Sequence, residues 1–330
     1  MKRLFVGIMA LLLVLTGCQN AMQEETVESK ETKIGILLSD SGLGDGSFND
    51  SAFRGLEKSR DELGILFDYR EAPTGNYEEM LVDLVEQGND LVIGLGFSVQ
   101  EALEKVAGEN PEQQFLLIDG VSELENVISI TFKEHEGSFL VGMVAAMTSN
   151  TGKIGFIGGA DIELIHRFEV GYTQGAQYVN PDIEVIADYA NNFGDSTLGS
   201  IIAEEQIEKG VDFIYPAAGF TGVGALQTAQ SKGVYGAGVD SDQFLLAEKA
   251  VVSSMLKNVD VAVFDTTKNL VNNQLTEQVY TLGLVESGVG LAPIRVVELT
   301  TEQQQLIEKA TEAISAGKID VQTKNNKGVT

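Results

Sequence analysis

Cysteine, proline, tryptophan and basic residues are all scarce in this chain of 330 residues. A single cysteine excludes an internal disulfide and a cysteine-rich metal cluster. Only 5 prolines beside 36 glycines exclude Pro-rich disorder and a collagen-like repeat. Lys+Arg 22 against Asp+Glu 49 gives a formal net charge of −27, so no basic surface can neutralise phosphates and we expect no nucleic-acid partner. At 43% hydrophobic, the chain can bury a core, and its length suggests about two domains.

The N-terminal residues have the features of a secretory signal. Lys2 and Arg3 form a basic region in front of the apolar stretch 4–16. That stretch is shorter than the roughly 20 residues that a membrane-spanning helix needs. We therefore predict a signal peptide over residues 1–17 and no membrane-spanning segment in the rest of the chain.

The residues Leu15-Thr16-Gly17-Cys18 resemble the bacterial lipobox, in which the cysteine after the cut accepts a diacylglycerol. Cys18 is the only cysteine of the chain, which makes the match more specific than four residues alone. We predict a lipid on Cys18 and a polar, flexible tether over residues 18–32 that holds an extracytoplasmic body at the membrane. The alternative is an uncleaved anchor that ends in a free cysteine.

After the tether, short apolar runs alternate with stretches of helical spacing, and the pattern restarts at residue 153. This alternation predicts two α/β lobes, each a parallel sheet covered by helices on both faces. The first lobe is expected to have strands at 33–38, 66–70, 90–95, 114–119 and 127–132, and helices at 47–63, 76–86, 99–107 and 134–147. The second is expected to have strands at 153–157, 183–188, 212–215 and 234–238, and helices at 162–179, 196–209, 222–231 and 301–316.

The expected domain boundary lies at 149–152, and the chain is expected to cross between lobes near Asn150, Asp260 and Gly288, which would form a hinge. Ligands of open α/β sheets bind beyond the carboxyl ends of the strands, and the unusual residues of this chain lie in those loops. Two lobes that face each other through such loops would enclose a ligand cleft. The lobes are expected to comprise 33–149 plus about 261–288, and 150–260 plus about 289–330.

No enzyme motif is present. Neither GxGxxG nor GxxxxGK[ST] occurs, and there is no GxSxG. His135 and His166 lie on separate predicted helices without an HExxH pattern. Asp240-Ser241-Asp242 is not followed by the glutamate of a calcium loop. We expect a protein that is not an enzyme and that holds no metal or cofactor.

Nine blocks of the chain, in order, resemble the basic membrane protein family, and they extend over roughly residues 33–320. The first block, DGSFNDSAFRG at 45–55, is the most specific. The others lie at 94–97, 115–119, 152–159, 168–172, 179–182, 217–219, 238–243 and 253–260. The resemblance implies a type I periplasmic-binding fold and a substrate-binding lipoprotein of an ABC importer for nucleosides, of the purine nucleoside receptor type. A permease and an ATPase would be its partners in trans, and the protein is expected to be a monomer.

The resemblance also implies a ligand site. Phe48 and Phe168 would sandwich the base, since a stacking face contributes about 1–3 kcal/mol per base. Asn49 and Asp119 would bond the edge of the base, because an amide donates and accepts while a carboxylate accepts from N–H. Asp240 and Lys257 would hold the ribose hydroxyls, with the Gly219 backbone beside them. Asp45 and Phe97 from the matching loops, together with Phe220, complete the set.

Each of these residues also has a structural interpretation. Phe48 and Phe168 could be core aromatics, Asn49 a helix cap and Asp119 a turn cap. Asp240 and Lys257 could form a surface ion pair of small energetic weight. Phe97 is a cleft wall or a core residue.

One position departs from the family pattern: Phe220 stands where a second glycine usually follows Ala-Ala-Gly. Its ring would either narrow the ribose end of the cleft or turn away from it. The main alternative function is therefore a binding lipoprotein for another small ligand, such as a sugar, peptide or signal molecule, in transport or sensing. An enzyme and a purely structural surface antigen are the remaining classes.

Overall fold

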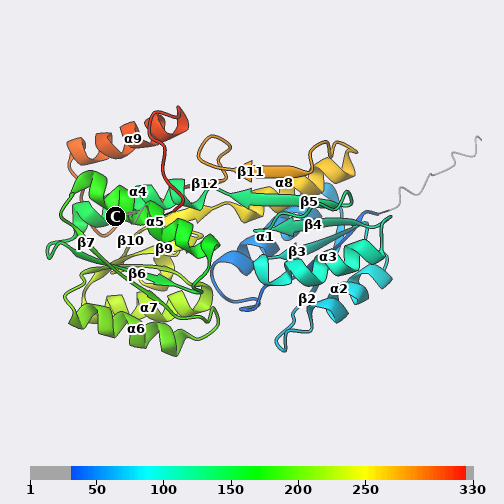
Figure 1. The fold of residues 1–330 in the computed structure, drawn as a ribbon, viewed down its shortest axis with the longest axis horizontal. Helices are drawn as coiled ribbons and strands as arrows, with labels where there is room; N and C mark the ends of the chain where they lie inside the picture. Colours follow the sequence, from blue (N-terminus) through cyan, green and yellow to red (C-terminus); the bar gives the residue numbers. More distant parts are fainter. Residues whose placement is uncertain (1–30, 325–330) are drawn as a thin grey trace, which may run out of the picture. The chain divides into compact units, whose positions relative to one another are not determined.

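The computed structural model describes residues 31–324, so the predicted signal peptide, Cys18 and nearly all of the tether lie outside the described residues. The described chain forms two six-stranded sheets (Figure 1). The first contains β1 (Lys33–Leu37), β2 (Leu66–Arg70), β3 (Leu91–Leu95), β4 (Gln114–Ile118), β5 (Val127–Phe132) and β11 (Val279–Leu282) in the order β11-β5-β4-β3-β1-β2. The second contains β6 (Lys153–Gly158), β7 (Glu184–Tyr189), β8 (Phe213–Ala217), β9 (Tyr235–Asp240), β10 (Val251–Lys257) and β12 (Val289–Leu291) in the order β12-β10-β9-β8-β6-β7.

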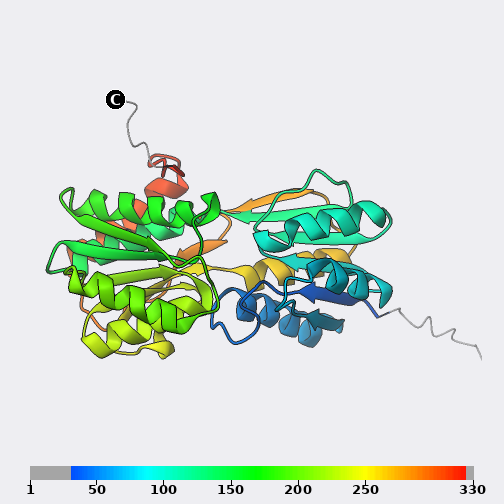
Figure 2. The same ribbon diagram turned by 60° about the horizontal axis from the view of Figure 1, so that its bottom comes forward.

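Helices cover both faces of the first sheet. Alternate side chains of its strands enter different cores, so Ile93 joins one cluster while its neighbour Val92 joins the other. The helices α1 (Phe48–Leu63) and α8 (Val259–Val271) pack side by side on one face (Figure 2). The helices α2 (Tyr77–Glu86) and α3 (Gln100–Glu109) pack together against the other face. The strands of this sheet are therefore buried on both faces, and the first lobe is a parallel sheet covered by helices, as the sequence predicts.

The second sheet is covered in the same way. The helices α4 (Glu134–Thr148) and α5 (Glu163–Val179) form one layer, and α6 (Ser196–Glu208) and α7 (Gly219–Lys232) form the other. Glycine allows α4 and α5 to approach closely, because a Cβ on Gly142 would lie 2.0 Å from the carbonyl oxygen of Tyr172. The last helix, α9 (Thr301–Ser315), packs against α4 (Figure 1).

The chain passes between the sheets in a different place from the one expected for the first crossing. The expected boundary at 149–152 follows α4, but α4 packs on α5, β10 and β12 of the second sheet. The first crossing therefore lies before α4, at Lys133. The chain returns at Asn258, between β10 and α8, and crosses again between β11 and β12. Asn258 and the last crossing are joined, because the backbone N–H of Asn258 donates to the carbonyl oxygen of Gly288 at 2.9 Å.

Sequence periodicity assigned no element between residues 239 and 300, and the structure has β10, α8, β11 and β12 there. These segments complete the two sheets and α8 covers the first of them. Of the strands, β12 pairs with β10 antiparallel, whereas β11 pairs with β5 parallel. Each sheet is thus completed by strands that come late in the chain.

Candidate functional site

A pocket lies between the two lobes, at the carboxyl ends of strands from both sheets. It encloses about 620 Å³ of space that no atom occupies, including its opening to solvent. Its lining is Ser39, Asp40, Ser41, Asp45, Phe48, Gly96, Phe97, Ser98, Asp119, Leu164, Ile165, Phe168, Phe193, Ala217, Ala218, Gly219, Val239, Asp240 and Lys257.

Two aspartates occupy corresponding places in the two lobes. Asp119 follows β4 and Asp240 ends β9, which are the equivalent strands of the two sheets. Both have left-handed backbone conformations, with φ of 66° and 62°. Aspartate tolerates this region better than most residues because its short polar side chain bonds locally. Each strand therefore ends in a sharp turn, and both carboxyl groups line the pocket.

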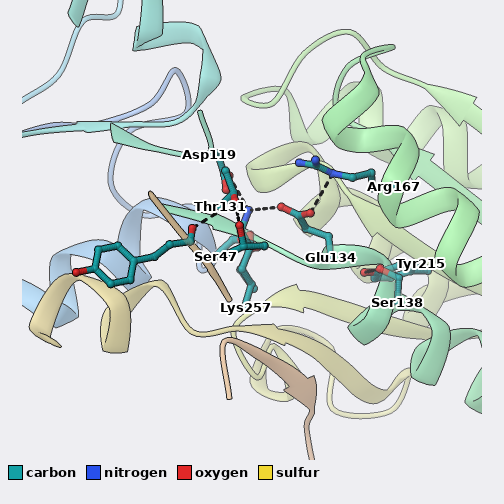
Figure 3. Close-up of polar contacts among 11 residues, drawn as sticks. Ser47, Asp119, Thr131, Glu134, Ser138, Arg167, Tyr215 and Lys257 are labelled. Carbon is teal, nitrogen blue, oxygen red and sulfur yellow. Dashed lines mark hydrogen bonds and ion pairs between the residues drawn. The ribbon is translucent and has the colours of Figure 1, made fainter. Parts of the chain in front are cut away.

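Lys257, the last residue of β10, brings a buried cation to the same place. Its side chain is 2% exposed, and its Nζ lies 2.6 Å from Asp119 Oδ2 (Figure 3). The ammonium also lies 5.0 Å from the ring centroids of Phe48 and Phe132 and 5.7 Å from that of Phe168. Aromatic faces attract a cation at these distances. The ion pair leaves Asp119 Oδ1 buried and without a hydrogen-bond partner among the described residues, so a ligand N–H can bond it.

Further charged side chains lie in contact with Lys257 on the side away from the pocket, in the second lobe. Glu134 Oε1 lies 3.5 Å from Lys257 Nζ, and Glu134 Oε2 lies 3.2 Å from Arg167 Nε on α5. Figure 3 shows Asp119, Lys257, Glu134 and Arg167 following one another in a row. We call these four residues the ion row. Its formal charges balance, with two carboxylates and two cations.

Burial and neighbouring charges shift the pKa values of this region. Burial raises the pKa of Asp240 to about 6, although Lys257 and a hydrogen bond from the Ser47 hydroxyl act in the opposite direction. Burial also raises the pKa of Asp45, against the hydrogen bonds that it accepts. For Lys257, burial alone would lower the pKa, but Asp119, Glu134 and Asp240 raise it above the ordinary value. The lysine is therefore charged at neutral pH.

The loop before α1 is ordered by Asn49. Its Oδ1 accepts from the backbone N–H of Ser39 at 2.9 Å, and its Nδ2 donates at 2.9 Å to Ser41 Oγ and to Asp45 Oδ2. Asp45 Oδ2 also accepts from the backbone N–H of Asn49 at 3.0 Å. Asn49 is fully buried behind the loop and does not line the pocket. The side-chain amide of Asn49 is therefore hydrogen-bonded within the protein. The sequence had instead predicted that it would bond the edge of the base.

Direct contacts hold the two lobes together beside the pocket. The Ser47 hydroxyl, next to α1, donates to Asp240 Oδ2 of the second lobe. Gln243 Nε2 donates to the carbonyl oxygen of Gly46 at 3.1 Å, and Arg54 Nη2 donates to Ser241 Oγ at 2.7 Å. The structure therefore has the lobes closed on each other at this edge.

The pocket brings together most of the residues singled out from the sequence. Phe220 does not line it, because α7 begins at Gly219 and its first turn carries Phe220 to a position that is 36% exposed. Cys18 lies outside the described residues. The expected residues that do line the pocket are Asp45, Phe48, Phe97, Asp119, Phe168, Gly219, Asp240 and Lys257.

Sequence reasoning did not single out Phe193 or Glu134. Phe193 lines the pocket after the edge strand β7, and its ring lies 6.2 Å from that of Phe97 across the lobes. No motif surrounds Phe193, and the sequence around it carries no signal that points to a ligand. Glu134 begins a predicted helix directly after a predicted strand, and that position at a strand end is the signal that could have drawn attention to it.

Among residues 31–324, no group of three or more His, Cys, Asp and Glu side chains could hold a metal ion. None of the helices in that range is both long enough and apolar enough to cross a membrane.

A buried, mixed polar and aromatic pocket between two parallel-sheet lobes is the architecture of a substrate-binding protein with the type I periplasmic-binding fold. Residues 32–323 match the family described as ABC transporter substrate-binding protein, PnrA-like. The chain belongs to this family, whose members bind substrates for transport. It is not a family of enzymes.

Relatives and solved structures agree with this assignment. Basic membrane protein B of Borreliella burgdorferi is 35% identical over 304 residues, which cover 88% of each chain. The CD4+ T-cell-stimulating antigen of Listeria innocua is 33% identical over 298 residues, covering 80% of this chain and 83% of that protein. The crystal structure of an ABC transporter solute-binding protein from Aeropyrum pernix K1 is 29% identical, with a TM-score of 0.82, covering 90% of this chain and 94% of that one.

Proposed function

We propose that the protein captures nucleosides, with purine nucleosides as the first candidates, and delivers them to an ABC permease. The observation that carries this proposal is that Phe48 from the first lobe and Phe168 from the second line the same pocket. A nucleobase has two flat faces, and a ring from each lobe can stack on them. Since the ligand would contact both lobes, its binding would favour the closed state.

The polar groups beside the rings match the rest of a nucleoside. The unpartnered Oδ1 of Asp119 can accept an N–H of the base edge. Lys257 and Asp240 can bond the ribose hydroxyls, with the backbone of Gly219 close by. Asn49 then acts behind the loop by fixing Asp45, rather than by touching the base. Phe220 does not line the pocket, so its ring would not narrow the sugar end.

The proposal extends to the location of the protein. A lipid on Cys18 would hold the binding lobes, as a monomer, at the extracytoplasmic face of the membrane, close to the permease. We expect Cys18→Ala to move the protein from the membrane fraction into the soluble fraction without changing its ligand affinity. Retention of the variant in the membrane fraction would contradict the lipid anchor.

Calorimetric titration tests the ligand. The purified protein is unfolded and refolded to remove any bound molecule, and is then titrated with adenosine, guanosine, inosine, uridine, cytidine, adenine and ribose. We expect saturable binding of ribonucleosides and much weaker binding of adenine and ribose, because each lost polar partner costs about 1–3 kcal/mol. Tight binding of ribose alone would favour a sugar, and no heat with any compound would overturn the proposal.

A further inference from the structure

Glu134 is a buried carboxylate at a junction between the lobes. It is the first residue of α4, directly after the crossing at Lys133, and its side chain is fully buried. It does not line the pocket. A carboxylate is expensive to bury unless other groups compensate its charge, so its partners indicate what it does.

Those partners are two cations on different elements. Oε1 lies 3.5 Å from Lys257 Nζ at the end of β10, and Oε2 lies 3.2 Å from Arg167 Nε on α5. Neither oxygen has a hydrogen-bond partner among the described residues, so the two ionic contacts carry its compensation (Figure 3). Arg167 directly precedes Phe168, the pocket wall of the second lobe. Glu134 thus connects the pocket cation to the helix that carries one pocket ring.

We propose that Glu134 is a positioning residue for the ligand site: its carboxylate holds the Lys257 ammonium between itself and Asp119, and its protonation loosens that hold and weakens ligand binding. The step that changes is a proton taken up by a Glu134 oxygen from solvent. Lys257 then keeps only Asp119 as a close anionic partner, at 2.6 Å. The ammonium moves toward Asp119 and is less available to a ligand. This inference rests on the proposed function for its ligand.

The charged and titratable groups around Glu134 are the other three residues of the ion row and several further side chains. Across the pocket side it faces Lys257, with Asp119 and Asp240 beyond; across α5 it faces Arg167. The Tyr215 phenol, which bonds Ser138 Oγ at 3.1 Å, is raised in pKa by burial first and by the charges of Asp240 and Glu134 in addition. The titratable neighbours on its own segment are Lys133, His135 and Glu136.

The direction of the pH effect follows from these surroundings. Burial raises the pKa of Glu134 to about 7, Asp119 adds to the increase, and Lys257 and Arg167 oppose it. Above that pH the carboxylate is charged and holds Lys257. Below it the carboxyl group is neutral. Ligand affinity should therefore fall as the pH decreases through about 7.

The test compares the full chain with Glu134→Gln, which resembles the protonated side chain at every pH. Calorimetric titrations with adenosine and with inosine are made from pH 5.5 to 8.5. We expect Glu134→Gln to bind about tenfold more weakly than the wild type at pH 8, the size of one lost charge-assisted contact. We expect it to bind equally at pH 5.5 and to lack the inflection near pH 7. Asp240 is present in both proteins, so the effect of its own titration on ligand affinity is the same in both and cancels in the comparison.

Variants of Arg167 distinguish positioning from a general structural role, and they serve if Glu134→Gln fails to fold. Arg167→Gln removes a cation that stabilises the carboxylate, so the inflection should move to higher pH, and Arg167→Lys should restore it. A merely structural defect would weaken binding at every pH without moving the inflection. The matched control is Glu184→Gln on β7, whose exposed carboxylate pairs with Lys153 at 3.1 Å and which should keep the wild-type profile.

A measurement without ligand separates this inference from the proposed function. Because the folded-state pKa of Glu134 is raised, the wild type should lose stability relative to Glu134→Gln as the pH rises from 4.5 to about 7. Urea unfolding at several pH values measures this difference. If no nucleoside binds but the difference appears, the proposed function fails and the ion row stands. A wild-type profile in Glu134→Gln, or an unmoved inflection in Arg167→Gln, overturns the inference.

Discussion

The two lobes have the same strand order, and they differ at one edge. The first sheet ends in β11, which runs parallel to β5, and the second ends in β12, which runs antiparallel to β10. The third chain crossing lies between β11 and β12, and the second follows β10 directly. Both crossings therefore begin at a strand of one of the sheets. The same strand order can therefore accommodate edge strands of opposite direction. The strands that carry the pocket residues keep equivalent positions in both sheets.

Corresponding positions at the strand ends show which residues the site needs. Asp119 and Asp240 match in place and in backbone conformation. The strands β5 and β10 hold equivalent places in the two sheets, and Phe132 ends β5 in the first lobe where Lys257 ends β10 in the second. The Lys257 ammonium lies 5.0 Å from the Phe132 ring centroid. The lobes thus contribute equivalent carboxylates, and only the second contributes the cation that they share.

The loops that precede the pocket helices also differ. In the first lobe, residues 39–49 form a network of serine, aspartate and asparagine side chains. In the second lobe, the helix α5 that follows β6 presents Leu164, Ile165 and Phe168. We conclude that the first lobe supplies most of the polar lining, and the second supplies mostly apolar walls together with Asp240 and Lys257.

The largest effect should follow removal of the cation that distinguishes the second lobe. Lys257→Met leaves Asp119, Glu134 and Asp240 without their shared partner, and breaking a buried pair costs about 3–5 kcal/mol. We expect a loss of that size in the free energy of unfolding at pH 7.5, together with loss of nucleoside binding. Urea denaturation and calorimetry measure both. The control Lys153→Met breaks an exposed pair and should cost about 1 kcal/mol or less; an equally small loss for Lys257→Met would show that the two lobes do not depend on the cation.

A second test addresses the buried carboxylate of the second lobe. The pKa of Asp240 is raised from 3.8 to about 6, so the stability that its protonated form contributes is present below 3.8 and is lost as the pH rises through about 6. Asp240→Asn should lack this loss, which amounts to about 3 kcal/mol at roughly 1.4 kcal/mol per pKa unit. Urea unfolding from pH 3.5 to 7.5 measures the difference. The exposed Asp182→Asn should follow the wild type, and parallel curves for Asp240→Asn would contradict the prediction.

Helix packing around two glycines, one in each lobe, differs in a way that alanine can probe. In the second lobe a Cβ on Gly142 of α4 would lie 2.0 Å from the Tyr172 carbonyl oxygen of α5, whereas a Cβ on Gly108 of α3 in the first lobe meets nothing within 4 Å. We expect Gly142→Ala to cost about 1–3 kcal/mol through overpacking. Gly108→Ala should gain about 0.5–1 kcal/mol, because glycine weakens a helix interior. Equal changes for the two variants, measured by urea unfolding, would refute the close approach of α4 and α5.

The smallest effect concerns the two rings that the lobes contribute to the proposed base site. Phe48→Leu and Phe168→Leu keep apolar bulk but remove a stacking face, so each should weaken adenosine binding by about 1 kcal/mol, or roughly fivefold. Phe244→Leu, which replaces a ring outside the pocket lining, is the control and should bind as the wild type does. A loss at only one of the two positions would show that the ligand rests on one lobe.

Much of the fold follows from periodicity. The strands and helices expected from residue 33 to 238 correspond closely to β1–β9 and α1–α7, because buried strands and amphipathic helices of ordinary length have distinct apolar patterns. Residues 239–300 were left without assignment. The segments there include the three-residue strand β12, which exists only because β10 lies beside it. Short strands acquire their conformation from pairing, and a local pattern carries little of that information.

The candidate site was predictable to a similar degree. Phe48 and Asp119 stand in loops at the ends of predicted strands, and the family resemblance added Lys257; all three line the pocket. Asn49 has the same local signal, but the folded loop surrounds its amide with Ser39, Ser41 and Asp45. Which polar side chain faces a ligand and which bonds the loop is decided by a rotation about the helix axis, and sequence spacing does not resolve it.

The sequence by itself determined the family, the two α/β lobes and the strand ends at which a ligand site could form, since these depend on local patterns and contiguous motifs. Only the tertiary structure decided the ionic arrangement. Lys257 and Asp119 are 138 residues apart, and Glu134 and Arg167 come from different helices. Coulomb attraction in a buried site depends on distances of a few ångströms, and these arise only when both lobes and the crossings between them have been assembled.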